Sequence, residues 1–301
     1  MNRTDYARSR LDGSAMVVLT VLCMCWGLNQ VSVKLANQGV TPFTQAAIRS
    51  FGAAVLLMAW AYWRAIPLFR RDGTLCAGLI AGALFGLEFL LIYWGLAYTT
   101  ASRAIVFVYA APFVVAVGAH VFIPGDRLNR VRLCGLFAAL AGVILAFSDE
   151  LSLPSPRALI GDAMCLGGAI AWGATTVLIK ATKLSRISAE KTLFYQLAVS
   201  AAMLAAAALA AEEAGVFAAT PLVLACVIYQ TAIVAFASYT TWFWLVARYP
   251  ASLLASFSFL TPIFGVVAGG IVLGEPIGVK LLGAVALIAA GIYLVNLPSR
   301  R

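Results

Sequence analysis

A polar cluster interrupts the first long apolar segment of the chain. Trp26, Asn29 and Gln30 lie near the middle of this segment, and residues three and four positions apart share one face of a helix. Hydrocarbon offers these side chains no hydrogen-bond partner, so we expect this face to turn toward protein or water.

A later apolar segment carries a similar arrangement, in which Trp172 is followed by Thr175 and Thr176. Such side chains have two interpretations. They hydrogen-bond to neighbouring helices and hold the helices together, or they line a polar cavity between helices. The matching placement at mid-depth in two segments favours the cavity.

Two prolines lie near the middles of further apolar segments. Pro112 and Pro262 should each kink a helix, because a proline leaves the carbonyl four residues earlier, on Val108 or Ser258, without its donor. Such a kink either fits the helix to its neighbours or breaks it near the midplane and offers carbonyls to a bound ammonium.

Glu88 is the one acidic residue deep in an apolar segment. A carboxylate there is costly, so it must be protonated, paired or hydrated. One hypothesis is that Glu88 carries protons during a transport cycle, and another is that it pairs with Arg49. The second half of the chain has Ser238 near the equivalent position, which favours transport without proton coupling.

These side chains, with aromatic residues at neighbouring positions, define one candidate cavity. The residues expected to line it are Trp26, Asn29, Gln30, Glu88, Tyr109, Pro112, Trp172, Thr175, Thr176, Tyr239, Phe259 and Pro262.

Metal or cofactor chemistry is not indicated. His120 is the only histidine, and the six cysteines are scattered through apolar runs, where packing is the simpler interpretation. Helix initiation or capping explains Asp126, Asp162 and Glu275, which lie close to expected helix starts. We therefore expect no catalytic residue, no metal and no cofactor.

The composition indicates a membrane protein. Of 301 residues, 63% are hydrophobic and 11% charged, and the mean hydropathy is +0.96, whereas soluble chains are about 25% charged. No segment is left for a soluble catalytic domain. Apolar runs of about 20 residues can each cross a bilayer. They predict ten transmembrane helices, at residues 14–36, 44–64, 74–97, 101–123, 130–148, 158–180, 191–212, 219–246, 251–273 and 278–297.

Basic residues set the expected orientation, because cytoplasmic loops are enriched in lysine and arginine. One set of connections holds little beyond Lys34, Arg103, Arg157 and Lys280. We therefore expect the other set and both termini to lie in the cytoplasm, and we attribute the net charge of +9 to topology rather than to nucleic-acid binding. The basic residues of that set are Arg3, Arg8, Arg10, Arg64, Arg70, Arg71, Arg127, Arg130, Arg132, Lys180, Lys183, Arg186, Lys191, Arg248, Arg300 and Arg301.

The chain contains two copies of one unit. Trp26 aligns with Trp172 at a shift of 146 residues, and later matches follow at shifts of 149 and 150. We expect a first repeat at residues 1–149 and a second at 150–301, with five helices each. Because five is odd, the second copy must enter the membrane inverted. Inverted repeats recur in transporters, which place a binding site between the copies near the midplane.

In combination, these features resemble the drug/metabolite transporter superfamily, specifically its EamA-type members with two five-helix repeats. The resemblance covers essentially the whole chain, and the aromatic side chains suggest similarity to the YddG-type bacterial amino-acid exporters. It rests on WG followed by a lysine in helices one and six, AAIRSFGAAVLL in helix two, YWGLAYTTAS before Pro112, VARYPASLLASFSFLTP, and GEP before the last helix.

The resemblance implies a bundle in the bacterial inner membrane. Helices one, three, four, six, eight and nine would enclose a central cavity, and helices five and ten would lie at the periphery. We expect a monomer whose partners are a small-molecule substrate and the lipid bilayer.

The leading functional hypothesis is a carrier that moves amino acids, aromatic ones included, or similar small metabolites out of the cytoplasm by alternating access. The first alternative is an efflux carrier for hydrophobic or cationic drugs, which an uncompensated Glu88 would favour. The second is an integral-membrane enzyme acting on lipids, for which the chain has no plausible catalytic constellation.

Overall fold

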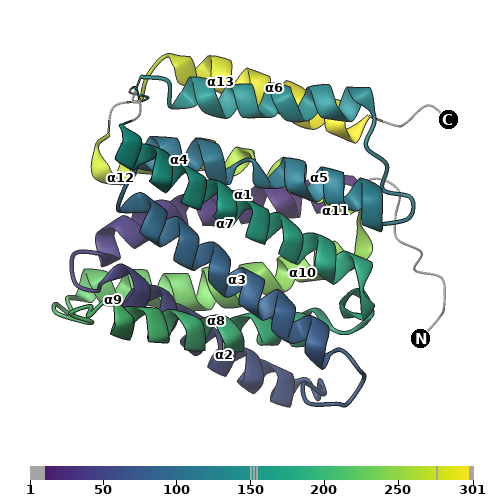
Figure 1. Ribbon diagram of the computed structural model, residues 1–301, viewed down its shortest axis with the longest axis vertical. Helices are drawn as coiled ribbons and strands as arrows, with labels where there is room; N and C mark the ends of the chain where they lie inside the picture. The colour runs from purple at the N-terminus through teal and green to yellow at the C-terminus, as the bar shows by residue number, and fades with distance from the viewer. Residues whose placement is uncertain (1–10, 150, 152, 154, 276, 298–301) are drawn as a thin grey trace.

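A computed structural model of the protein describes residues 11–149, 151, 153, 155–275 and 277–297 (Figure 1). Five of the basic residues that predict the orientation, Arg3, Arg8, Arg10, Arg300 and Arg301, lie outside the described residues, as does residue 150 at the expected repeat boundary. The described part of the chain folds into helices and contains no strand, only an isolated bridge between Val40 and Val216.

The first half supplies five spanning units, the fourth of which is divided. They are α1 (Gly13–Ala36), α2 (Pro42–Trp63), α3 (Leu75–Leu96), α4 (Ala101–Val108) with α5 (Ala111–Phe122), and α6 (Arg130–Ala146).

The second half supplies five more, of which the third and fourth are divided. They are α7 (Pro156–Ala181), α8 (Ala189–Ala210), α9 with η2 and α10, α11 (Ala251–Phe257) with α12 (Leu260–Leu273), and α13 (Lys280–Asn296). In the third unit, α9 (Pro221–Ile228) continues through the π-helix η2 (Tyr229–Ser238) into α10 (Tyr239–Arg248). A short 3-10 helix, η1 (Lys183–Arg186), precedes α8.

All ten predicted helices are present, and their bounds agree with the prediction to within two residues. Eight of these units, counting the divided ones as single spans, are long and apolar enough to cross a membrane. The other two, α6 and α13, have 17 residues each, which gives about 25 Å at 1.5 Å per residue, the lower limit for a span.

The two halves run in opposite directions. Gly95 of α3 lies against Gly161 of α7, whereas Ile92, nearer the start of α3, lies against Gly168, so α3 and α7 are antiparallel. The chain crosses the bundle once, in α2, between α1 and α3, so α1 and α3 share one direction. The first helix of the second half is therefore inverted relative to the first helix of the chain.

Helices of one half pack against helices of the other. The first helix of each half packs on the second piece of the divided fourth helix of the other half, as α1 on α12 and α7 on α5. The two fifth helices, α6 and α13, pack together, as do the two second helices, α2 and α8. The α6–α13 pair lies at one edge of the bundle, and α2 and α8 lie at the opposite edge (Figure 1). Gly135 and Gly291 let the backbones of α6 and α13 meet, since a Cβ on either residue would lie 2.5 or 2.6 Å from the other's carbonyl oxygen. The peripheral placement of helices five and ten is confirmed.

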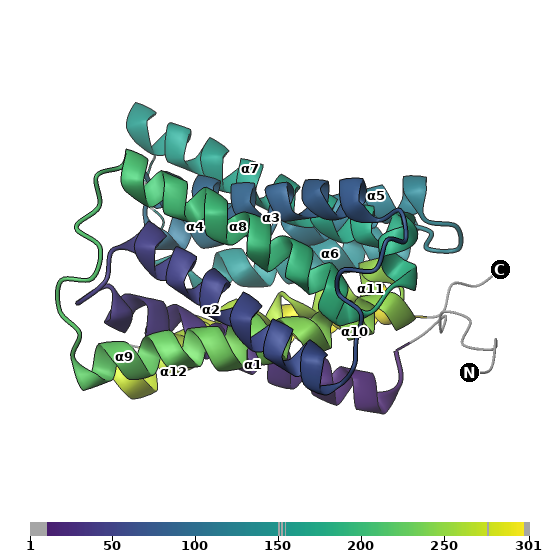
Figure 2. The same ribbon diagram turned by 90° about the horizontal axis from the view of Figure 1, so that it is seen from below.

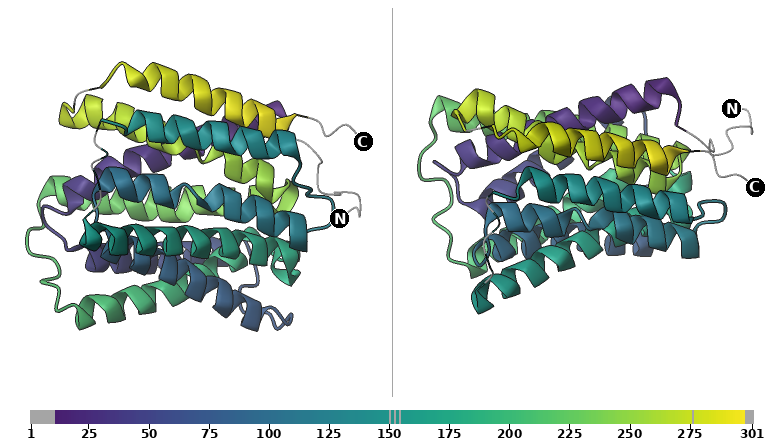
Figure 3. Two further views of the ribbon diagram at one scale, coloured as in Figure 1. Left: turned by 45° about the horizontal axis from the view of Figure 1, so that its top comes forward. Right: turned by 90° about the horizontal axis from the view of Figure 1, so that it is seen from above.

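The long helices all run along one direction of the bundle, as two further views show (Figure 3). The two predicted helices that contain Pro112 and Pro262 are both interrupted, as predicted. α4 ends at Val108 and α5 begins at Ala111, and α11 ends at Phe257 and α12 begins at Leu260. Each proline lies in the first turn of the second piece, where its missing N–H costs least.

The loops divide between two ends of the bundle. Lys191 donates to Asp72 at 2.7 Å, and Tyr249 donates to Asp12 at 2.9 Å. We call this side the basic end, because the loops and helix ends there carry most of the described basic residues. These are Arg64, Arg70, Arg71, Arg127, Arg130, Arg132, Lys180, Lys183, Arg186, Lys191 and Arg248.

The opposite end carries Lys34, Arg103, Arg157 and Lys280. The connection between α8 and α9 runs across this end (Figure 2). There the Glu213 carboxylate accepts the backbone N–H groups of Phe43 and Thr44 at 2.9 and 2.8 Å. A loop of the second half thereby caps the N-terminus of α2.

Candidate functional site

Trp26 is the centre of an aromatic cluster between α1 and the third helix of the second half. Its indole Nε1 donates to the Ser238 hydroxyl at 2.9 Å. Its ring meets Trp242 and Tyr239 edge to face, with centroids 5.5 and 6.3 Å apart. Ser238 is the last residue of the π-helix η2, and Tyr239 and Trp242 lie in the first turn of α10. The π-helix therefore helps to position the partners of Trp26.

The aromatic contacts continue from Tyr239 into α3. The ring centroids of Tyr239 and Phe85 are 5.9 Å apart, and those of Phe85 and Phe89 are 5.1 Å apart. The guanidinium of Arg49 lies 4.4 Å above the centre of the Phe89 ring, within the range of a cation–π interaction. Side chains from four helices thus form a continuous wall that ends at a charged group.

Arg49 and Glu88 are both buried, with 1% and 8% of their surface exposed. Nε and Nη2 of Arg49 and Oε2 of Glu88 have no hydrogen-bond partner among the described residues. The carboxyl lies within electrostatic range of the guanidinium, yet the ion pair that the sequence allows between them is not among those the described residues form. The two charged groups therefore interact electrostatically but do not form an ion pair.

A second aromatic cluster lies at the two helix breaks. Tyr109 follows α4 and Phe259 precedes α12, and their ring centroids are 6.1 Å apart. Trp172 of α7 meets Tyr109 edge to face at 6.3 Å. Tyr109 and Phe259 are buried, and both belong, with Trp26 and Tyr239 at its margin, to one continuous apolar core. Pro112 and Pro262 lie beside this cluster.

The amides of helix one point to different neighbours. Oδ1 of Asn29 is buried and has no partner in the described part of the chain. Gln30 packs against Gly265 of α12, where a Cβ would collide with its amide oxygen. Gln30 therefore contributes to the α1–α12 contact, whereas Asn29 has unused hydrogen-bonding capacity.

The threonines of helix six satisfy their own helix. The hydroxyl of Thr175 donates to the Ala171 carbonyl at 2.8 Å, and that of Thr176 donates to the Trp172 carbonyl at 3.3 Å. Each hydroxyl keeps only acceptor capacity for another group. The aromatic members of the twelve selected side chains lie in two clusters, and the border of all twelve on one cavity stays a prediction.

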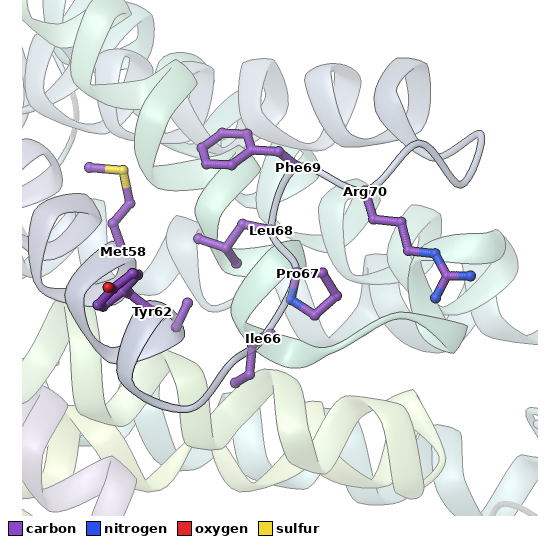
Figure 4. Close-up of a pocket in the computed structure, with 8 residues that line it drawn as sticks. Met58, Tyr62, Ile66, Pro67, Leu68, Phe69 and Arg70 are labelled. Atoms are coloured by element: carbon purple, nitrogen blue, oxygen red, sulfur yellow. The ribbon is translucent and has the colours of Figure 1, made fainter.

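Two pockets open elsewhere on the bundle. A groove of about 470 Å³ lies at the basic end after α2, lined by Met58, Ala61, Tyr62, Ile66, Pro67, Leu68, Phe69 and Arg70 (Figure 4). A smaller pocket of about 200 Å³ lies between α1, α9 and α12. Neither contains any of the twelve candidate residues.

Asp162 has a different role from the one expected. Ser155 caps α7, and Asp162 lies in the second turn, where it is ion-paired with Arg103 and accepts the Thr99 hydroxyl at 2.7 Å. The helix-capping interpretation of Asp162 is therefore wrong. This residue connects α7 to the start of α4, and the sequence gives no local signal for such a partner.

Asp126 also departs from the expectation. Asn129 caps α6, and Asp126 accepts the Ser252 backbone N–H at 3.1 Å and the Ser252 hydroxyl. Arg132 donates to Oδ1 of the same carboxylate at 3.3 Å. The carboxylate thereby holds the start of α11, so it links the two halves instead of initiating its own helix.

Sequence reasoning missed two features of this region. The π-helix η2, ten residues long, has no proline or glycine to indicate it, although π turns often mark functional sites. The sequence suggests Arg49 only as a partner for Glu88, and its place above Phe89 becomes visible only in the folded structure. A lone arginine in an apolar segment was the available signal.

Comparisons with known proteins agree with this architecture. The sequence profile of the EamA-like transporter family matches residues 13–148 and, a second time, residues 159–297. A solved crystal structure superposes with a TM-score of 0.82 over 94% of this chain and 96% of that one, at 19% identity. At that identity the likeness shows the fold alone.

Several relatives span nearly the full length. A probable amino-acid metabolite efflux pump of Salmonella typhimurium is 28% identical over 297 residues, covering 95% of each chain. The protein of the same name from Escherichia coli is 26% identical over the same shares. A transporter of Archaeoglobus fulgidus is 26% identical over 290 residues, covering 95% of this chain and 98% of that protein.

Proposed function

Because the chain belongs to the EamA-like transporter family, we propose that it exports amino acids or similar small metabolites from the cytoplasm by alternating access. Two full-length relatives bear the name of amino-acid metabolite efflux pumps, which supports the substrate class. The inverted halves support the mechanism, since exchanging the conformations of two inverted copies turns an inward-open state into an outward-open one.

The observation that carries this proposal is a difference in exposure between equivalent residues at the two ends of the bundle: Asp126 and Lys180 at the basic end, and Glu275 and Lys34 at the opposite end. At the basic end, Asp126 is 3% exposed and is fully engaged with the start of α11. Lys180 donates to the Val246 carbonyl at 2.5 Å. These contacts join α5, α7, α10 and α11 and close this end of the bundle.

At the opposite end, the equivalent residues are Lys34 and Glu275. They form an ion pair of 2.5 Å, but their side chains are 65% and 46% exposed. Equivalent positions are therefore buried at one end and open to solvent at the other. We infer a carrier closed at its basic end, and we place that end in the cytoplasm because basic loops face the cytoplasm.

The division into units at residues 149 and 150 is part of this proposal, as is a monomer in a bacterial inner membrane. The contact of Asp126 with Ser252 at the basic end and that of Lys34 with Glu275 at the opposite end each join one repeat to the other, so a single chain contains both gates. No second copy is needed for the cycle.

Counterflow in liposomes tests the proposal. Purified protein is reconstituted, the vesicles are loaded with an unlabelled amino acid, and entry of the labelled compound is followed for the twenty amino acids with and without a pH gradient. We expect labelled uptake above protein-free vesicles for at least one apolar or aromatic amino acid, without need for the gradient.

Failure of every amino acid to exchange would contradict the proposed substrate class. Uptake of hydrophobic cations in place of amino acids would support the drug-carrier alternative, for which the unpaired carboxylate of Glu88 is the favourable observation. The neighbouring guanidinium of Arg49 argues against it, because a cation placed there would meet a positive charge.

A further inference from the structure

Arg49 and Glu88 lie at a similar depth in the half of the bundle nearer the opposite end. Arg49 is seven residues after the start of α2, and Glu88 is eight residues before the end of α3, so both lie about 11 Å below the helix ends at 1.5 Å per residue. Both side chains are buried at this depth.

Packing does not account for this pair. A buried guanidinium normally donates to carboxylates or carbonyls, and a buried carboxylate normally accepts from donors, because an unpartnered buried charge is strongly unfavourable. Here Nε and Nη2 of Arg49 and Oε2 of Glu88 are partnerless within the described residues. A group of the opposite charge would therefore stabilise each of the two buried side chains.

A single ligand that carries both signs satisfies both residues. A carboxylate suits the planar donors of Arg49, which bind carboxylates in a bidentate manner. An ammonium suits the carboxylate of Glu88. The two side chains interact electrostatically without forming an ion pair, so a single zwitterionic ligand would supply each of them with a group of the opposite charge.

The aromatic wall specifies the rest of the ligand. Phe89 lies under the guanidinium, and Phe85 and Tyr239 continue the wall toward Trp26. Rings arranged edge to face present faces on which an apolar or aromatic side chain packs. A strongly charged side chain would find no counter-charge among these rings.

The second half lacks this pair. Gln196 holds the position in α8 equivalent to Arg49, seven residues after the helix start, and its amide donates to its own helix at Thr192. Ser238 takes the place of Glu88 and is bonded to Trp26. The charges are thus confined to one half, where they orient a ligand in one way only.

We propose that Arg49 and Glu88 bind the carboxylate and ammonium of a zwitterionic amino acid, with Phe85, Phe89 and Tyr239 receiving its apolar side chain. This assignment rests on the proposed transport function and names the site that recognises the substrate.

Ligand-dependent melting temperatures of the purified full-length protein test the site directly. The twenty amino acids are the first probes. The best binder is then compared with the amine made by removing its carboxylate and with the acid made by removing its ammonium. We expect the amino acid to bind at least about 30-fold more tightly than either analogue, equivalent to about 2 kcal/mol at about 1.4 kcal/mol per tenfold.

Variants assign each charge. Glu88→Gln should abolish the discrimination against the acid, and Arg49→Gln should abolish the discrimination against the amine. Arg49→Lys keeps the charge but loses the bidentate geometry, so it should weaken binding of the amino acid and still reject the amine, even where Arg49→Gln fails to fold. Ser200→Ala, at a buried position of α8 where the hydroxyl already donates to the Leu197 carbonyl of its own helix, is the control and should leave all preferences unchanged.

The site is overturned if no amino acid raises the melting temperature, if both analogues bind as tightly as the amino acid, or if both charge variants weaken all three ligands equally. Amino-acid exchange in liposomes combined with equal binding of the analogues would overturn this site and leave the transport function standing. Absence of exchange for every amino acid would contradict the transport function itself.

Discussion

The third helix of each half occupies an equivalent place but is built differently. α3 is a regular α-helix, and Gly78 and Gly82 let it approach α8 closely, since a Cβ on either would lie within 2.6 Å of Tyr195. Its counterpart, α9–η2–α10, has no glycine in its sequence and widens into ten residues of π-helix. Small residues let α3 pack closely on its neighbour, whereas its counterpart packs with a backbone that the π-helix widens.

The polar group on each of these helices differs as well. Ser238 accepts from Trp26 and donates to the Val234 carbonyl at 2.6 Å, so its hydroxyl is satisfied from both sides. Oε2 of Glu88 has no partner in the described structure. The two third helices hold equivalent places in the two repeats, but of the two only α3 carries a carboxylate oxygen without a partner among the described residues. The comparison therefore distinguishes a residue that serves the architecture, Ser238, from one that is available to a ligand, Glu88.

The largest difference should appear between Glu88→Gln and Ser238→Ala. Removing one member of a buried charge site costs about 2–5 kcal/mol of ligand binding, so Glu88→Gln should reduce amino-acid exchange at least about 30-fold. Ser238→Ala loses one neutral hydrogen bond, which costs about 1 kcal/mol of stability, and should exchange nearly normally. Counterflow rates in liposomes measure the contrast.

Two other outcomes for Glu88→Gln are informative. If exchange survives while transport driven by a pH gradient collapses, Glu88 carries protons and does not bind the ammonium. If exchange and gradient-driven transport are both unchanged in a stable variant, the carboxylate has neither role.

Trp26→Ala and Trp172→Ala test whether the two aromatic clusters act together. Trp26 contacts Tyr239 and Trp242, and Trp172 contacts Tyr109. We expect each substitution to cut exchange about tenfold, roughly 1.4 kcal/mol, while folded protein remains in the membrane by size-exclusion chromatography. Normal exchange by both variants would assign the tryptophans to packing alone.

The glycine surface of α3 should affect the stability of the protein rather than its exchange rate. A Cβ on Gly82 would lie 2.6 Å from the backbone oxygen of Tyr195, whereas one on Gly86 would meet the flexible sulfur of Met203 at 2.7 Å. Gly82→Ala should therefore destabilise the protein by about 2 kcal/mol, and Gly86→Ala by less than about 1 kcal/mol. Melting temperatures in one detergent compare them, and equal effects would contradict the close approach of α3 and α8.

Glu213, where the two halves meet at the opposite end, should give an effect on stability that depends on pH. Burial raises the pKa of its carboxyl, but hydrogen bonds from Thr41, Phe43 and Thr44 outweigh this, so the pKa lies below its ordinary range. This stabilisation is present above the unfolded-state pKa of about 4.3 and is lost as the pH falls through the lower folded-state pKa.

Glu213→Ala should cost about 1–2 kcal/mol at neutral pH, as the loss of a helix cap does. Its melting temperature should converge with that of the unmodified protein in acid. Glu212→Gln, at an exposed neighbouring position, should change neither value. A deficit that persists undiminished in acid would show that the charge of Glu213 does not contribute.

The spans and their inversion were predictable because a bilayer imposes them locally. Twenty apolar residues must form a helix to satisfy their backbone, and the prolines predicted the interruptions near Tyr109 and Phe259 that the structure contains. These features depend on neighbouring residues in the chain and not on tertiary contacts.

Partners across the bundle were not predictable from one sequence. Asp126 and Asp162 looked like helix-starting residues, yet their hydrogen bonds reach Ser252 and Arg103 in other helices. The Asn29 amide oxygen has no partner in the part of the chain that the structure describes, whereas Gln30 contacts α12. Which of the two faces α12 depends on how α1 is rotated about its own axis, and the spacing of residues in the sequence does not determine that rotation.

Reciprocal cross-linking of the two ends tests the exchange of states most directly. In a protein with its six native cysteines replaced, cysteines are introduced at Asp126 and Ser252 for the basic end, or at the equivalent Glu275 and Ser102 for the opposite end. Side chains in contact allow a disulfide, and reduced forms of both double variants serve as transport controls.

Alternating access predicts that the pair at Asp126 and Ser252 cross-links readily and that its disulfide stops exchange until it is reduced. It predicts that the pair at Glu275 and Ser102 also cross-links, during turnover with amino acid, and also stops exchange. In a variant carrying both pairs, locking one end should prevent the disulfide at the other. Simultaneous disulfides at both ends of one molecule, or undiminished exchange with either end locked, would contradict the account.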